Sequence, residues 1–266
     1  MMIGRQTERI VGAASAVLVL VGAARAEAVR SMVPECRSGP TRQEALAGLG
    51  VRGELVLASG DRAVLDGIRW PAEDDGEARA WMLNHRDRAL TLVPRGEIDR
   101  WGRVHVDAAV SGEAIDLAGG LIEAGLAYAD AGERDTLCRP ALLTLESGAR
   151  SATRGLWQAG VRDGRDGAAL REATGHFIVA QGRVVNVGER PARTYLDFAR
   201  RGEDGLTVTV SKRTWRRLRE RGLSAATLRG RIVRVRGIVE AWRGPTLDIA
   251  SADMIEVLDE ERTLRR

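Results

Sequence analysis

Two arginines near the C-terminal end of the chain have a spacing suited to contact with an anion. Arg234 and Arg236 alternate with Val233 and Val235 in an apolar segment typical of a strand. Because successive side chains of a strand point to opposite faces, valines that face the interior place both arginines on the outer surface. Guanidinium groups on an exposed strand can bind the phosphates of nucleic acid, so we take Arg234 and Arg236 as candidate binding residues.

Two aromatic residues of the same region complete this hypothesis. Proteins that bind single strands combine a cationic groove with aromatic rings on which the bases stack. Tyr195 and Trp242 are the rings available for stacking, although each ring could instead pack at the rim of the fold. We find no catalytic constellation in this part of the chain.

The chain contains two cysteines, and its first residues indicate the compartment in which they meet. An apolar run from Ile10 to Ala24 follows a basic start and ends in small residues, which predicts a secretory signal peptide cleaved near Ala26. The run is too short to span a bilayer, so we expect no stable membrane insertion and a periplasmic or secreted protein. Export favours a disulfide between Cys36 and Cys138, and two buried free thiols are the alternative.

Charge is distributed unevenly along the mature chain. Residues 27–175 carry 19 basic and 24 acidic side chains, whereas residues 176–266 carry 19 and 12. The basic C-terminal part therefore fits a polyanionic partner, and a solvated basic face is the alternative. The hydrophobic fraction of 44% and the charged fraction of 29% are typical of a globular protein, so composition indicates neither a disordered chain nor a membrane protein.

Hydrophobic periodicity predicts a mainly β protein with helices, in which strands followed by helices are typical of an α+β or small-barrel order and a second strand-rich unit follows. In the first half we expect a short helix near Thr41–Leu49, strands over 55–57, 63–68, 89–93 and 103–110, and helices over 77–84, 114–127 and 140–155. In the second half we expect strands over 177–187, 194–199, 206–210, 231–242 and 246–250, with a basic helix over 212–221. The predicted segments are a signal peptide (1–26), a lead-in (27–50), a first domain (51–159), a glycine-rich linker (160–175), a basic domain (176–258) and a charged tail (259–266).

Four ordered motifs of the first domain resemble the thermonuclease family, the relatives of micrococcal nuclease. Asp99-Arg100-Trp101-Gly102-Arg103 is similar to the family's D-[KR]-[YFW]-G-R element, and Leu65–Pro71 is similar to its L.GIDAP element. Leu121–Ala127 resembles the end of a family helix, and residues 145–157 resemble its E..AR....G.W terminus. The resemblance covers less than half of the chain and implies a five-stranded OB barrel with packed helices. The second half resembles generic OB-fold modules, so the two resemblances together imply two five-stranded, OB-like barrels in tandem.

The resemblance also implies a chemistry, which is hydrolysis of phosphodiesters with one Ca²⁺. Arg103 stands where the family has an arginine that neutralises charge on the phosphate. Arg69, however, stands where the family has a metal-binding aspartate, which replaces a ligand by a positive charge. Val64 stands in place of the second phosphate arginine, and Ala72 follows the proline where the family has its catalytic glutamate.

Some acids lie close enough in sequence to substitute for the missing groups. Glu73 is the candidate for a replacement base, with Asp74 and Asp75 beside it, although a shift of one residue redirects a side chain. The three histidines are far apart and predict no zinc site. We therefore predict no metal and no cofactor, with Ca²⁺ required only if nuclease activity persists.

Three functions follow from these patterns. The leading hypothesis is a catalytically degenerate, exported binding protein whose partner is single-stranded nucleic acid or an envelope protein. The first alternative is an active Ca²⁺-dependent nuclease, and the second is a structural module that binds another envelope protein. EDTA-sensitive cleavage of DNA distinguishes the active nuclease. Salt-insensitive binding, or no binding to oligonucleotides, favours the protein-binding module, because phosphate contacts release counterions and must weaken with salt.

Overall fold

The computed structural model describes residues 36–71 and 75–258 of the chain. The predicted signal peptide, the start of the lead-in, the charged tail and Glu73 lie outside these residues. Within the described ranges, no helix is both long enough and apolar enough to cross a membrane.

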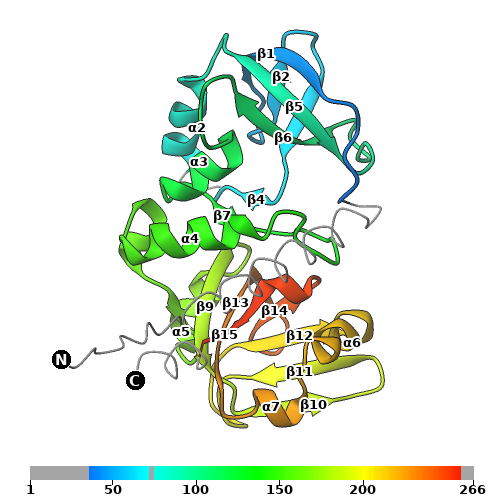
Figure 1. Cartoon of the computed structure of the whole chain (residues 1–266). Helices are drawn as coiled ribbons and strands as arrows, with labels where there is room; N and C mark the ends of the chain where they lie inside the picture. The colour runs from blue at the N-terminus through cyan, green and yellow to red at the C-terminus, as the bar shows by residue number, and fades with distance from the viewer. Residues whose placement is uncertain (1–35, 72–74, 259–266) are drawn as a thin grey trace, which may run out of the picture.

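The first half is built on a closed, OB-like barrel of five strands (Figure 1). The strand order around the barrel is β1-β2-β3-β6-β5, and β5 pairs with β1 to close it. All neighbours are antiparallel except β3 and β6, which are parallel with Leu65 opposite Val106. The strands are β1 (Arg42–Leu49), β2 (Leu55–Leu57), β3 (Arg62–Leu65), β5 (Ala89–Arg95) and β6 (Val104–Val110).

Alternation of side chains explains why these segments form a barrel. In β5, Leu90 and Leu92 are fully buried, and in β6 Val106 and Ala108 are fully buried two residues apart. Such period-two patterns fill the interior of a small barrel and leave the intervening side chains outside. The hairpin that the sequence predicts between residues 55 and 68 is confirmed by the antiparallel pairing of β2 with β3.

The expected helix near Thr41–Leu49 is wrong, because these residues form strand β1. Its Ala, Leu, Gln and Glu side chains favour a helix locally. In the folded chain, however, β1 pairs with both β2 and β5. Closure of the barrel requires this strand, so tertiary pairing overrides the local preference.

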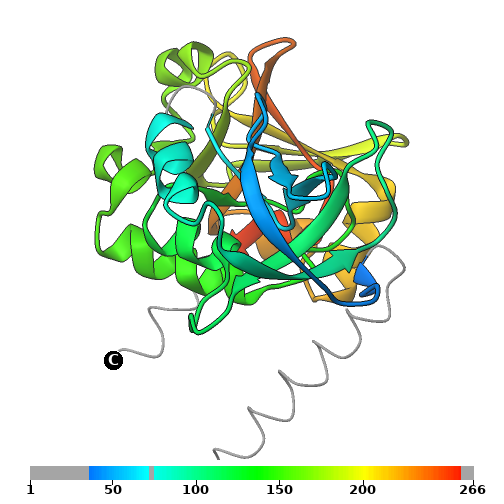
Figure 2. The same ribbon diagram turned by 90° about the horizontal axis from the view of Figure 1, so that it is seen from above.

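The helices of the first half stand together beside the barrel (Figure 2). Their buried residues include Ala78, Met82, Leu121 and Leu142, which join the barrel core. The remaining elements of this half are two short strands, β4 and β7, which pair with each other, and a 3-10 helix. The bounds are α2 (Asp75–Leu83), α3 (Leu117–Glu123), α4 (Ala141–Ser151), β4 (Ile68–Arg69), β7 (Tyr128–Ala129) and η2 (Gly155–Ala159).

The second half contains an open eight-stranded sheet. Its hydrogen-bonded order is β10-β11-β12-β14-β13-β9-β8, and β15 pairs with β13 beside this path. The strands are β8 (Arg162–Asp163), β9 (Phe177–Arg183), β10 (Asn186–Glu189), β11 (Arg193–Asp197), β12 (Thr207–Ser211), β13 (Ile232–Ala241), β14 (Pro245–Ile249) and β15 (Ile255–Val257). The helices are α5 (Gly167–Glu172), α6 (Lys212–Glu220), α7 (Ala225–Leu228) and η3 (Ala252–Met254).

The predicted second barrel is therefore wrong, since the sheet is not closed by strand pairing. The single strand expected here divides at Val184 and Val185, where the chain changes hydrogen-bond partners. The N–H of Val184 donates to the carbonyl of Arg231 at 2.9 Å, on the β13 side, and the N–H of Val185 donates to the carbonyl of Asp197 at 2.8 Å, beside β11. The single predicted strand over 177–187 thus divides into β9 and β10, which form different parts of the sheet.

Residues 160–175, which the sequence predicts as a linker, have regular structure. Strand β8 pairs in parallel with β9, and helix α5 begins after Asp166, whose side chain accepts a hydrogen bond from the N–H of Ala169. Leu170 of this helix is fully buried in the core. The segment packs with the second sheet.

The two halves share an extensive contact through α4, β7 and the loop between them (Figure 1). At its centre, Arg236 of β13 donates from Nη1 to Glu146 Oε1 of α4 at 2.7 Å, and both side chains are buried. Beside this ion pair, Trp157 and Ala149 pack against Val179 of β9. Helix α4 therefore lies between the rest of the first half and the second sheet.

Candidate functional site

A cavity of about 290 Å³ opens on the barrel where β3 ends and β6 begins. We call it the basic cleft, because four arginines line it together with two aspartates and one histidine. Their backbones come from separate segments, namely the loop before β2, the turn between β3 and β4, strand β4, the start of β6 and the loop after β7. The seven side chains are Arg52, Arg69, Arg103, Arg134, Asp66, Asp130 and His105.

Asp66 is the most deeply buried charged group of the basic cleft. His105 Nδ1 lies 3.5 Å from Asp66 Oδ1, and Arg134 forms an ion pair with the same oxygen. Burial raises the pKa of Asp66, but His105 and Arg134 outweigh this effect and hold the pKa below its usual value. The Asp66 carboxylate is therefore ionised at neutral pH, and one of its oxygens contacts both His105 and Arg134.

Arg103 reaches the basic cleft from a tight turn. The turn is fixed by Asp99, whose Oδ1 accepts hydrogen bonds from the N–H groups of Trp101 and Arg103, each at 2.9 Å. The Arg103 guanidinium donates from Nε to Asp99 Oδ2 at 2.8 Å and lies 4.9 Å from the centre of the Trp101 ring. Burial raises the pKa of Asp99, but these hydrogen bonds lower it by more. The pKa of Asp99 therefore lies below its usual value. Arg103 is thus held in place and stays partly exposed.

Arg69 is neutralised within the basic cleft and does not point freely into it. Its Nε donates to Asp130 Oδ2 at 2.6 Å, and its guanidinium lies 5.4 Å from the ring centre of Phe177 in the second half. The position that the resemblance assigns to a metal-binding aspartate is therefore occupied by a paired cation.

The donor set of the basic cleft does not fit Ca²⁺. That ion takes six to eight oxygen ligands, chiefly carboxylates and carbonyls. Here the two aspartates are already paired with Arg69, Arg134 and His105, and no group of three or more His, Cys, Asp or Glu side chains suited to a metal occurs among the described residues. Arginines instead dominate the lining, and such a set suits an anion.

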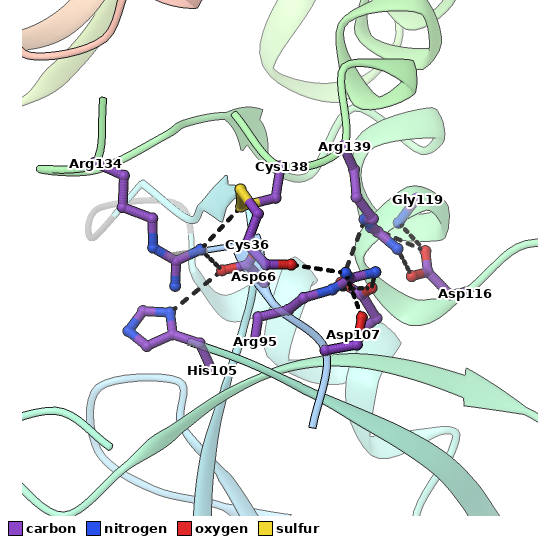
Figure 3. A network of polar contacts seen from close by, with 11 residues as sticks. Cys36, Asp66, Arg95, His105, Asp107, Asp116, Gly119, Arg134, Cys138 and Arg139 are labelled. Atoms are coloured by element: carbon purple, nitrogen blue, oxygen red, sulfur yellow. Dashed lines mark hydrogen bonds and ion pairs between the residues drawn. A yellow bond between two sulfur atoms is a disulfide. The ribbon is translucent and has the colours of Figure 1, made fainter. Parts of the chain in front are cut away.

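A polar network beside the basic cleft surrounds the disulfide between Cys36 and Cys138 (Figure 3). The Nη1 of Arg95 donates to the carbonyl of Cys36 at 3.2 Å, and its Nε donates to Asp107 Oδ2 at 2.8 Å. On the other side, the Nη1 of Arg134 lies 3.6 Å from Cys138 Sγ. The predicted disulfide is present, and it ties the start of the barrel to the loop that carries Arg134.

The sequence-predicted residues of the second half do not form one site. Arg236 is only 1% exposed, and it pairs with Glu146 and Glu256, so the prediction that it lines an outer surface is wrong. Arg234 is mostly buried as well, and it donates from Nη1 to Glu256 Oε2 at 3.2 Å. The alternation along β13 is confirmed, but Arg236 is covered by Glu146 of the first half, and Arg234 contacts Glu256 and Gln181 of the second half.

The two aromatic candidates lie apart. Trp242 is 64% exposed in the turn between β13 and β14, and Arg243 lies 5.3 Å from its ring centre. Tyr195 lies half-buried on β11, opposite Thr209 of β12. No ring contact joins them within the part of the chain that the structure describes.

Sequence reasoning missed four groups of the basic cleft, namely Arg52, Asp66, Asp130 and Arg134, and gave His105 no role. Asp66 belongs to the motif Leu65–Pro71, so its place near the site was available from the sequence. Asp130 and Arg134 lie in a loop without a recognisable motif, and their approach to the barrel follows only from the tertiary fold.

A larger cavity of about 750 Å³ lies between the two halves. Its walls include the rings of Tyr128, Trp157 and Phe177, whereas Arg162 is the single arginine on its lining. None of the sequence-predicted site residues contributes to it. The basic cleft is therefore the better candidate for an anion site.

Comparison with known proteins does not assign the chain to a family. No family model matches it, and a search of curated proteins finds no significant match. The barrel, the basic cleft and the disulfide therefore stand on the geometry alone.

Proposed function

We propose that this protein is an exported, catalytically degenerate relative of the thermonucleases that binds nucleic acid through the basic cleft. The observation that carries the proposal is the convergence of four arginines on one cavity whose acids are already paired with basic groups. Such a surface attracts phosphate, because guanidinium groups form charge-assisted hydrogen bonds with phosphate oxygens.

Two further observations support kinship with the thermonucleases. Arg103, from the D-[KR]-[YFW]-G-R element, lines the basic cleft. Gly125 and Gly155, from the two C-terminal motifs, lie in direct backbone contact, and the N–H of Leu156 donates to the carbonyl of Gly125 at 2.9 Å. Both glycines have positive φ, and a Cβ at Gly125 would lie 2.3 Å from the carbonyl oxygen of Arg154. The motif glycines are thus required by a single close contact.

The pairing of Asp66 and Asp130 with basic groups is also the reason why we expect no hydrolysis of phosphodiesters. A Ca²⁺ ion would have to displace arginine or histidine from Asp66 or Asp130, while Arg69 repels it. The residues that the structure describes therefore offer phosphate binding without an assembled metal site for activation of water.

Fluorescence anisotropy with a labelled single-stranded oligonucleotide tests the binding proposal. If about three phosphates are neutralised, affinity should fall roughly 20-fold between 50 and 200 mM salt. The variant Arg103→Ala should weaken binding about 10-fold, since one charge-assisted contact is lost. The matched control is Arg86→Ala, which removes an exposed arginine outside the basic cleft.

The outcomes are distinct. Absence of binding, or binding that does not weaken with salt, would contradict the proposal and would favour a protein-binding module. In a separate cleavage assay with Ca²⁺, the wild-type protein should degrade single-stranded DNA no faster than Arg103→Ala. Cleavage by wild type that EDTA and Arg103→Ala both abolish would show instead that the protein is an active nuclease.

A further inference from the structure

We propose that Asp253, in the second half, is a positioning residue for the basic cleft of the first half. It acts through the loop Asp130–Arg139, which carries Arg134 to the cleft wall. The inference rests on the proposed phosphate-binding function of the cleft.

The loop supplies one wall of the basic cleft. Asp130, Gly132 and Arg134 line the cavity, and the Arg134 guanidinium pairs with Asp66 on the barrel. Between β7 and α4 the loop contains no helix or strand. A ten-residue segment of this kind does not hold a long side chain at a fixed place without contacts to other parts of the fold.

Asp253 provides such contacts from the second half. Its Oδ2 accepts hydrogen bonds from Thr136 Oγ1 at 2.9 Å and from the N–H of Leu137 at 2.8 Å. Its Oδ1 lies 2.9 Å from Nη1 of Arg221, which holds the carboxylate in position. Beside it, Ser251 Oγ donates to the carbonyl of Asp135 at 3.0 Å. Asp253 and Thr136 are both buried, so these bonds are shielded from water.

The loop is fixed at a second point by the disulfide from Cys138 to Cys36 (Figure 3). Arg134 precedes both anchors in sequence, by two residues for Thr136 and by four for Cys138, and its Nη1 lies 3.6 Å from Cys138 Sγ. Arg213 and Arg217 of α6 also pair with Asp135 of the loop. The position of Arg134 in the cleft therefore depends on side chains of the second half, more than 100 residues away in sequence.

A double-mutant cycle tests this dependence on the oxidised, full-length protein with a single-stranded oligonucleotide as the probe. Arg134→Ala should weaken binding about 10-fold, because it removes the guanidinium from the cleft. Asp253→Ala should weaken binding about 3-fold to 10-fold, because Arg134 is then present but no longer held at the cleft wall. The double variant should bind no more weakly than Arg134→Ala alone, since Asp253 then has no side chain left to position.

Conservative variants separate positioning from general loss of structure. Asp253→Asn keeps an oxygen for Thr136 and Leu137, so it should restore most of the affinity. Thr136→Val should weaken binding in the same direction as Asp253→Ala with a smaller risk of unfolding. The matched control is Ser224→Ala, which removes the N-cap of α7 in the second half without touching the loop and should leave affinity unchanged.

Each result decides the inference. If Arg134→Ala weakens binding and Asp253→Ala does not, or if the two losses add in the double variant, the positioning role is refuted. If wild type does not bind at all, the proposed function fails, and hydrogen exchange of residues 130–139 then decides the positioning role without a ligand. Faster exchange in Asp253→Ala but not in Ser224→Ala would support it, and unchanged exchange would refute it.

Discussion

Replacement of Arg236 by methionine tests how much the buried ion pair between the two halves contributes to the free energy of unfolding. The guanidinium donates to Glu146 at 2.7 Å and also pairs with Glu256. Burial lowers the pKa of Arg236 below its usual value, although Glu146 opposes this effect. Burial therefore disfavours the charged form of this guanidinium. Methionine fills much of the same volume but leaves Glu146 buried without this partner.

The expected loss can be worked out from the contacts that remain. Removal of one member of a buried ion pair costs about 3 to 5 kcal/mol. Glu146 keeps Arg150 at 3.1 Å and the N–H of Ala129 at 2.8 Å. The loss should therefore lie at the lower end, at about 3 kcal/mol of unfolding free energy. The double variant Arg236→Met with Glu146→Gln should recover only part of it, because the buried negative charge is then removed but Arg150, whose side chain is 13% exposed, loses the Glu146 carboxylate as a partner.

Urea unfolding followed by circular dichroism measures these differences, with Arg165→Met as the control. Arg165 is exposed, so its replacement should change stability by less than about 0.5 kcal/mol. A loss below about 1 kcal/mol for Arg236→Met would refute the reasoning. Weaker oligonucleotide binding at unchanged stability would instead restore the surface role that the sequence predicts for this arginine.

Three further predictions concern stability. Reduction of the Cys36–Cys138 disulfide, which spans 102 residues, should lower the unfolding free energy by roughly 2 to 5 kcal/mol in urea, and two alkylatable thiols in the native exported protein would contradict the bond. A fragment of residues 160–258 should unfold cooperatively at higher urea than one of 176–258, because β8 and the buried Leu170 belong to its core, and equal midpoints would contradict this. Asp66, whose folded pKa is lowered, contributes stability that is present above its ordinary pKa and is lost as pH falls through the folded value. Asp66→Asn should therefore lose less stability than wild type below about pH 4, and parallel curves for both proteins would show that Asp66 does not contribute.

Local patterns were sufficient to predict most elements of the fold. The hairpin of β2 and β3, the helices α2, α3, α4 and α6, and the strands β5, β6, β11 and β14 all carry their periodicity in consecutive residues. The strand β1 was not predictable in this way, because its composition favours a helix and its strand state depends on partners far along the chain. The change of partner at Val184 also has no local signal, since valine fits either strand.

The candidate site was only partly predictable for a similar reason. The sequence predicts that Arg103 begins a strand after a turn, and in the structure the strand β6 begins one residue later, at Val104. The covering of Arg236, in contrast, results from packing between the two halves, which alternation along one strand does not report. The contribution of Arg134 depends on a loop whose position is fixed by Asp253 and the disulfide.

The open sheet of the second half has free edges, and their sequence has a consequence for behaviour in solution. Unpaired strand edges invite another chain to add a strand, which is a common route to aggregation. The edge strand β8 is only two residues long, and both of them, Arg162 and Asp163, are charged and exposed. At the opposite end, β10 has four residues, with exposed Asn186 and Glu189 and with a glycine between them. Short, charged edges of this kind oppose edge-to-edge association, so the chain should stay dispersed at high concentration although its sheet is not closed.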